Sequence, residues 1–394
     1  RRPLRPGRMK IYRVGGSVRD ELLGCLVADR DYVVVGATPE IMRALGFRSV
    51  GRDFPVFLHP QTHDEYALAR TERKSGRGHR GFVFHASPEV TLEEDLARRD
   101  LTINAMARDE DGTLVDPFGG ARDLEQGVLR HVGAAFAEDP LRVLRVARFA
   151  ARFGFKVAPG TLALMRDIAA DGELATLSAE RVWQELSRAL MERTPSRFIT
   201  VLRQCGALPA VLPEVAALCG RSEPKSGALE RLLRALDAAA AAQDTLPVRY
   251  AVLTGTLGAN ARSRALRAER LSRRVNAPVD CRDLALLVAR LCGRVERARE
   301  LSARETLDLI LAADALRRPE RFRALLRVCA LWHFADAGSA QDYAPAAELA
   351  DAVAAVRQVD GGRLAAAAKG RDVARRIRAA RLDALRRRRK PLRT

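Results

Sequence analysis

Two aspartates, Asp29 and Asp31, stand at the start of a β-branched segment, residues 31–35, that is predicted to form a strand. Side chains at positions i and i+2 of a strand lie on the same face, so the two carboxylates are expected to face the same way. Two such carboxylates repel each other unless a cation lies between them, and Mg²⁺ prefers oxygen ligands. The pair therefore indicates a metal platform for phosphoryl or nucleotidyl transfer. Taken alone, a D-x-D sequence is common by chance and is more often part of a surface turn.

A glycine-rich turn precedes this pair of aspartates. It joins a predicted strand at 10–14 to a predicted helix and contains Gly15 and Gly16, which allow the backbone to approach a ligand closely. Free N–H groups at the start of the helix favour phosphate, and Arg19 adds a permanent positive charge. The turn is therefore a candidate triphosphate site, with a purely structural turn as the alternative. A dinucleotide-binding loop is disfavoured because the G-x-G-x-x-G spacing is absent.

Five sequence blocks, in order, resemble the family of class II tRNA nucleotidyltransferases and bacterial poly(A) polymerases. The first two are the G-G-x-V-R-D turn and the D-x-D pair. The others are R-R-D-x-T-x-N-A at 98–105, D-P-F-G-G at 116–120 and E-D-x-x-R at 138–142. The segments at 51–60 and 69–76 are similar to bacterial CCA-adding enzymes in particular, and a weaker likeness continues through 180–185.

This resemblance implies both a fold and an activity. The fold is an α/β nucleotidyltransferase head, with a small polymerase-β-like mixed sheet, followed by an all-α neck, body and tail. The activity is template-independent addition of CCA to the 3′ end of tRNA from CTP and ATP, with Mg²⁺ held by Asp29 and Asp31. Glu65, on a neighbouring predicted strand, is a candidate third carboxylate. The residues expected to contact the triphosphate and ribose are Gly16, Arg19, Arg99, Asp100 and Asn104.

Asp139 and Arg142 form a second candidate pair. A carboxylate acceptor and a guanidinium donor can satisfy the Watson–Crick edges of cytosine and adenine. In the resembled family this pair acts as a protein template for CTP and ATP. The residues also allow a structural interpretation, because Asp139 before Pro140 is a good helix N-cap. Arg145 and Arg148 follow on one side of the predicted helix, and the resemblance implies that both contact the nucleotide.

The elements that must position these residues divide the chain into an α/β part and a helical part. The first part contains further predicted strands at 54–59 and 65–69, a helix begun by a capping box at 17–20, a helix at 39–45 and a basic loop at 71–81. From residue 139 onward the pattern is helical. We therefore predict a catalytic head at 9–138, with Met9 as the expected start, a helical neck at 139–212 and a helical body and tail at 213–394.

Charge and cysteine content narrow the partners and the compartment. With 68 basic and 49 acidic residues the net charge is +19, which favours a polyanionic partner such as tRNA. The basic end of the chain, residues 386–390, either contacts phosphates or is a solvated helix end. Six cysteines without C-x-x-C spacing indicate reduced thiols and a cytoplasmic protein. No apolar run reaches about 18 residues, so no membrane association is expected.

The predicted body departs from relatives that carry a metal-dependent HD phosphohydrolase domain. Thr254 and Gly255 stand where its His-Asp pair would be, and of six histidines only His333 lies beyond residue 131. Such a centre needs several imidazole ligands, so no HD-domain metal is expected. The region is expected to be a helical scaffold that binds tRNA.

Three alternatives remain at this stage. A poly(A) polymerase shares all five blocks, although the segments at 51–60 and 69–76 favour CCA addition. Addition of CC alone or of A alone is compatible with the same residues. An inactive RNA-binding module is disfavoured because Asp29 and Asp31 are both present.

Overall fold

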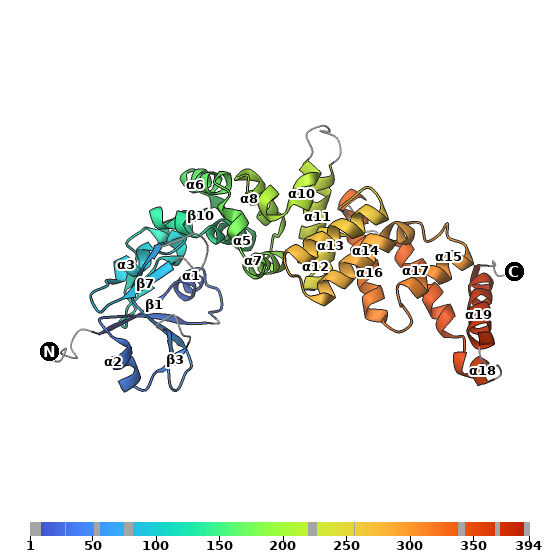
Figure 1. Cartoon of the computed structure of the whole chain (residues 1–394), viewed down its shortest axis with the longest axis horizontal. Coiled ribbons are helices and arrows are strands. Elements are labelled where there is room, and N and C mark those ends of the chain that lie inside the picture. Colours follow the sequence, from blue (N-terminus) through green and yellow to red (C-terminus); the bar gives the residue numbers. More distant parts are fainter. Residues whose placement is uncertain are drawn as a thin grey trace. The chain divides into compact units, whose positions relative to one another are not determined.

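The computed structural model describes residues 9–27, 29–50, 56–74, 82–219, 227–255, 257–337, 343–366 and 371–389. The chain divides into two compact units (Figure 1). The first runs to Glu185 and also includes Arg197–Val211, whereas the second comprises Leu186–Ser196 and the chain from Leu212 onward. None of the described helices is both long and apolar enough to cross a membrane.

A mixed seven-stranded sheet forms the centre of the first unit, in the order β3-β4-β5-β2-β1-β8-β9. β1 lies antiparallel between β2 and β8, whereas β2 and β5 run parallel. In this register Asp31 is the partner of Glu65, so both side chains project from the same face of the sheet. The strands are β1 (Lys10–Val14), β2 (Asp31–Val35), β3 (Arg48–Val50), β4 (Val56–Leu58), β5 (Glu65–Leu68), β8 (Ala107–Arg108) and β9 (Leu114–Val115).

Alternation along β2 explains why this strand is central. Val33 packs into an apolar cluster with Leu96 of α3 (Leu92–Ala97), while its neighbour Val34 packs into another cluster with Met42 of α2 (Pro39–Ala44). Successive side chains of a strand point to opposite faces of the sheet, so a run of β-branched residues packs into the core on each face. The strand is thereby held rigidly, and Asp31 stands at its first position.

The loop expected at 71–81 is wrong for residues 71–74. These belong to β6 (Arg70–Lys74), which pairs antiparallel with β7 (Phe82–Ala86). The rest of the expected loop lies outside the described residues. A two-stranded ribbon is held by backbone hydrogen bonds, which a basic and polar segment can form as well as an apolar one.

The first helix also differs from expectation. α1 (Gly16–Leu22) has Gly15 as its N-cap and no side-chain capping bond. Ser17 Oγ instead donates to Val14 O at 2.9 Å, and Asp20 accepts from Arg19 and Arg152. The predicted capping box is therefore wrong, because the two side chains have partners outside the helix end.

Beyond residue 139 the first unit is mainly helical, apart from β11 (Lys156–Val157), which pairs parallel with the earlier strand β10 (Val128–Leu129). α5 (Leu141–Phe153) is buried along most of its length and ends at Gly154, whose φ of 73° is left-handed. The helices that follow are α6 (Pro159–Ala170), α7 (Ala179–Met191), which continues into the second unit, α8 (Ser196–Gln204) and α9 (Leu208–Val211).

The described part of the second unit is helical, and α14 is central to it, packing against α12, α13 and α16. The helices are α10 (Pro213–Ala216), α11 (Ala228–Ala241), α12 (Leu246–Thr254), α13 (Ala261–Arg274), α14 (Val279–Glu296), α15 (Ala303–Ala312), α16 (Pro319–Ala337), α17 (Ala344–Arg357), α18 (Gly361–Ala366) and α19 (Arg371–Arg389). The expected fold class, an α/β head followed by helices, is confirmed.

Candidate active site

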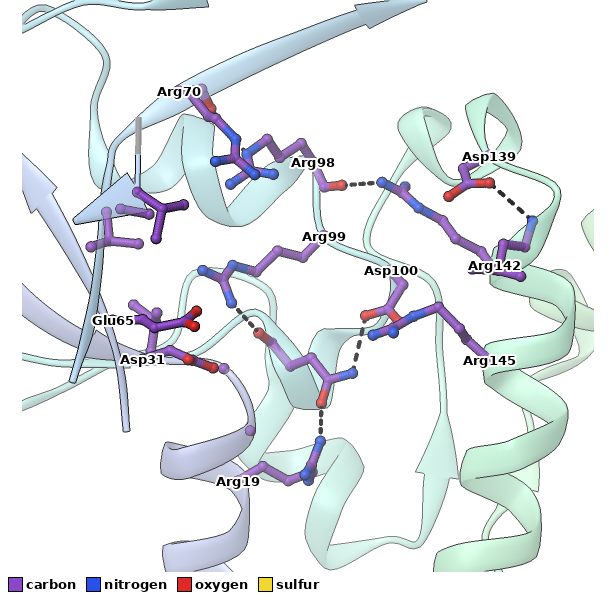
Figure 2. A pocket seen from close by; sticks show the side chains of 18 of the residues that line it. Arg19, Asp31, Glu65, Arg70, Arg98, Arg99, Asp100, Asp139, Arg142 and Arg145 are labelled. Atoms are coloured by element: carbon purple, nitrogen blue, oxygen red, sulfur yellow. Dashed lines mark hydrogen bonds and ion pairs between the residues drawn. The ribbon is translucent and has the colours of Figure 1, made fainter. Parts of the chain in front are cut away.

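A cavity of about 680 Å³ in the first unit gathers most of the predicted site residues. Its walls come from the glycine turn, the starts of β2 and β5, the segment at 98–104, the start of α5 and one residue of α7 (Figure 2). Asp29 and Arg148 do not line it, although both are described. The predicted residues that do are Gly16, Arg19, Asp31, Glu65, Arg99, Asp100, Asn104, Asp139, Arg142 and Arg145.

The glycine turn requires glycine at its first position. Gly15 has φ 70°, and a Cβ built there would lie 2.7 Å from Arg99 Nη1. Its N–H donates to Met106 O at 3.1 Å, which ties the turn to the segment that follows Asn104. Any other residue would therefore be strained and would displace Arg99 from the cavity wall.

Asp100 organises one wall of the cavity. Its Oδ1 accepts from Asn104 Nδ2 at 3.0 Å, and its Oδ2 accepts from Arg145 Nε at 2.7 Å (Figure 2). Burial alone would raise the pKa of Asp100, but Arg145 and Asn104 outweigh it and hold that pKa well below the ordinary value. Asn104 Oδ1 in turn accepts from Arg19. Asp100 therefore has a fixed negative charge that orients two neighbours and leaves neither oxygen unpaired.

The carboxylates meet at the start of β2. Asp31 and Glu65 lie side by side in Figure 2, as their strand register requires. Burial raises the pKa of Asp31 above its ordinary value; Arg99 opposes this shift and Asp29 adds to it. Asp29 is thus close enough to act on Asp31. Within the described parts of the chain, however, no group of three or more His, Cys, Asp or Glu side chains is placed to hold a metal ion.

Asp139 has two roles in the structure. Its Oδ1 accepts from the backbone N–H of Leu141 at 3.0 Å, as a helix cap would, and its Oδ2 accepts from Arg181 Nη2 at 2.8 Å. Arg142 donates to Ala135 O at 2.8 Å and to Arg98 O at 2.6 Å. Asp139 can therefore both accept a hydrogen bond at the start of α5 and line the cavity. Its long-range partner Arg181 was not predicted, since no local spacing links residues that lie 42 positions apart in the sequence.

Arg148 is placed differently from its expected role. It is 6% exposed, and its Nε donates to Glu185 Oε2 of α7 at 2.6 Å. Its guanidinium also lies over the Phe149 ring, 4.4 Å from the centroid. In this position Arg148 braces α5 against α7, whereas Arg145, one turn earlier, reaches the cavity.

The D-P-F-G-G block packs behind the site. Asp116 accepts from the N–H groups of Gly120 and Ala121 at 2.7 and 2.9 Å. A Cβ at Gly120 would lie 2.2 Å from Thr102 O. This contact explains the second glycine of the block, because the turn at 102–104 that presents Asn104 rests directly on it.

The chain is similar to known proteins over nearly the whole length of both sequences. Residues 11–130 match the family described as "Poly A polymerase head domain", and residues 154–219 match "Probable RNA and SrmB- binding site of polymerase A". The chain is 54% identical to the multifunctional CCA protein of Azoarcus sp. (strain BH72), covering 96% of this chain and 97% of that one. It is 56% identical to the multifunctional CCA protein of Aromatoleum aromaticum (strain DSM 19018 / LMG 30748 / EbN1), covering 91% and 93%.

Solved structures share the fold at lower sequence identity. A CCA-adding enzyme in apo form II superimposes with a TM-score of 0.69 at 22% identity, covering 96% of this chain and 88% of that one. The Bacillus stearothermophilus CCA-adding enzyme in complex with CTP gives 0.65 at 24% identity, covering 96% and 89%. Sequence identity over nearly the whole chain, together with this fold, shows that the protein belongs to the family of multifunctional CCA proteins.

Proposed function

We propose that this protein adds CCA to the 3′ end of tRNA without a nucleic-acid template, using CTP and ATP. The observation that carries the proposal is the 54% identity to a multifunctional CCA protein across 96% of the chain. The cavity is consistent with this proposal, because its walls combine carboxylates, arginines and the acceptor–donor pair Asp139 and Arg142. Action on tRNA also implies a cytoplasmic location, in keeping with six free cysteines.

The carboxylates at the start of β2 are suited to binding Mg²⁺. Mg²⁺ in such sites takes one or two protein carboxylates and completes its shell with water and substrate phosphates, so a three-residue cage is not required. We assign Asp31 and Asp29 to the ion, with Glu65 as an additional ligand in register with Asp31. When bound, the ion would lower the pKa of the tRNA 3′-hydroxyl and stabilise charge on the α-phosphate.

The arginines hold the nucleotide in reach of these carboxylates. Arg19 and Arg99 border the glycine turn and are assigned to the triphosphate, with Gly16 leaving room for it. Asp100 and Asn104 fix the positions of Arg145 and Arg19. The chain thus contributes orientation and electrostatic stabilisation, which are the main protein contributions to nucleotidyl transfer.

Base choice is assigned to Asp139 and Arg142. Cytosine and adenine both carry an exocyclic amino group, which a carboxylate accepts, beside a ring nitrogen that a guanidinium reaches. Uracil and guanine carry a carbonyl oxygen at the corresponding place, which a carboxylate repels. An Asp139 carboxylate held in place by Leu141 N and Arg181 therefore favours CTP and ATP over UTP and GTP.

Incubation with single nucleotides tests this proposal. On tRNA that lacks CCA, CTP alone should add two residues and ATP alone should add none. On tRNA that ends in CC, ATP alone should add one. Extension by a long A tract would favour the poly(A) polymerase alternative, and activity with only one nucleotide would indicate a CC-adding or A-adding enzyme.

A further inference from the structure

Asp95, on α3 just outside the cavity, is a fully buried carboxylate that contacts two arginines of the cavity wall. Its Oδ1 accepts from Arg98 Nη2 at 2.6 Å and Nε at 3.2 Å, and its Oδ2 accepts from Arg99 Nη2 at 3.2 Å. The side chain is 0% exposed. A third arginine is tied to the same group, because Arg70 N donates to Asp95 Oδ1 at 3.4 Å and Arg70 O accepts from Arg98 Nε at 3.0 Å.

Electrostatics keeps this carboxylate ionised. Burial alone would raise the pKa of Asp95, but Arg98 and Arg99 outweigh the burial and hold that pKa below its ordinary value. A buried charge is tolerated only when it is paired and hydrogen-bonded, and here both oxygens are. The guanidinium groups of Arg98 and Arg99, which would otherwise repel each other, are thereby held in place, and the backbone N–H of Arg70 contacts the same carboxylate.

The arginines, unlike Asp95, face the cavity. Arg70, Arg98 and Arg99 all line it, and Figure 2 shows them above Asp31 and Glu65. Asp95 pairs with the guanidinium groups of Arg98 and Arg99, so this wall presents positive charge at fixed positions. Planar guanidinium groups match phosphate oxygens in bidentate geometry, so the wall suits a polyphosphate better than a neutral base or ribose.

We infer that Asp95 is a positioning residue, which holds Arg98 and Arg99 toward the polyphosphate of the bound nucleoside triphosphate. The inference rests on the proposed nucleotidyltransferase function. It assigns the Arg98 and Arg99 side chains a role different from that of Asp139 and Arg142, which are assigned to the base. A purely structural Asp95 would stabilise the first unit without any preference for phosphate.

Equilibrium binding of CTP and of CMP by the full chain separates these roles. In Asp95→Asn the arginines lose their anchor, so the Kd for CTP should rise about tenfold or more, which corresponds to about 1.4 kcal/mol. The Kd for CMP, which lacks the β- and γ-phosphates, should change less than about threefold on the same scale. If Asp95→Asn fails to fold, Asp95→Glu serves as the second variant. It keeps a paired charge but moves the carboxylate by one methylene, so it should also weaken CTP binding more than CMP binding.

Asp244→Asn is the matched control, because Asp244 pairs with Arg327 at 2.9 Å in the second unit and neither residue lines the cavity. It should lower stability with CTP and CMP binding unchanged. The inference is overturned if the Asp95 variants bind CTP like the wild type, or if CTP and CMP weaken by the same factor. A wild-type chain that binds neither CTP nor ATP would instead refute the proposed function.

Discussion

The substitution Asp139→Asn separates base reading from helix capping. Asparagine keeps a side-chain oxygen that can accept from Leu141 N, so the cap at the start of α5 should survive. In the variant an NH₂ group, which donates, replaces the second oxygen, which accepts from Arg181 in the wild type. That donor opposes the amino groups of cytosine and adenine and suits the carbonyl oxygens of uracil and guanine.

The expected magnitude follows from one lost base contact. A good bidentate base contact is worth about 1–3 kcal/mol, so the preference for CTP over UTP should fall about 5-fold to 150-fold. The assay is the ratio of kcat/KM for CTP and UTP on tRNA that lacks CCA. Thermal unfolding of the same preparation reports stability, which should fall by less than in Asp139→Ala.

A matched control tests the capping explanation. Ser302 caps α15 in the second unit by accepting from Glu305 N, and Ser302→Ala should cost about 1 kcal/mol without altering nucleotide choice. If Asp139→Asn retains full discrimination while Asp139→Ala and Ser302→Ala lose similar stability, Asp139 is only a cap, and the assignment of base reading is refuted.

Three further predictions concern the carboxylates and the second unit. Asp31→Ala should lower nucleotide incorporation by several orders of magnitude while filter binding of tRNA stays nearly intact, because phosphate contacts dominate affinity; retained incorporation would contradict the metal assignment. Burial and Asp29 raise the pKa of Asp31, and Arg99 opposes this shift. Because Mg²⁺ binds the ionised form, Mg²⁺ affinity should fall on acidification at a higher pH than for an ordinary aspartate. Asp29→Asn should move that fall to lower pH, and an unchanged Mg²⁺ titration profile would count against the coupling. No metal-dependent phosphatase or 2′,3′-cyclic phosphodiesterase activity is expected, because Thr254 and Gly255 supply neither an imidazole nor a carboxylate at the place of a His-Asp pair; turnover that persists in an Asp29/Asp31 double variant would reveal a second active site.

Local signals in the sequence predicted the strands that carry the chemistry. The β-branched runs Lys10–Val14 and Asp31–Val35 have the same bounds in the structure as in the sequence-based prediction. Glu65 was proposed from its place on a neighbouring strand, and the parallel register does bring it beside Asp31. Period-2 alternation and the glycine turn are local properties, so they are accessible without an alignment.

Interactions across the chain were less accessible. Asp139 precedes α5 and Arg181 lies on α7, so the two meet only through tertiary packing, as do Arg148 of α5 and Glu185 of α7. Asp95 did have a local signal, because Arg98 and Arg99 follow it by three and four residues at the end of α3. That spacing is common on solvated helices, and only burial distinguishes a positioning carboxylate from a surface ion pair.

The most direct test of CCA addition uses tRNA lacking CCA and an equimolar mixture of CTP, ATP, UTP and GTP. Sequencing the 3′ ends of the products reads both the order of addition and the point at which it stops. We predict that nearly all extended molecules end in CCA. Products that continue as A tracts, or that contain U or G at the frequency of C, would contradict the account.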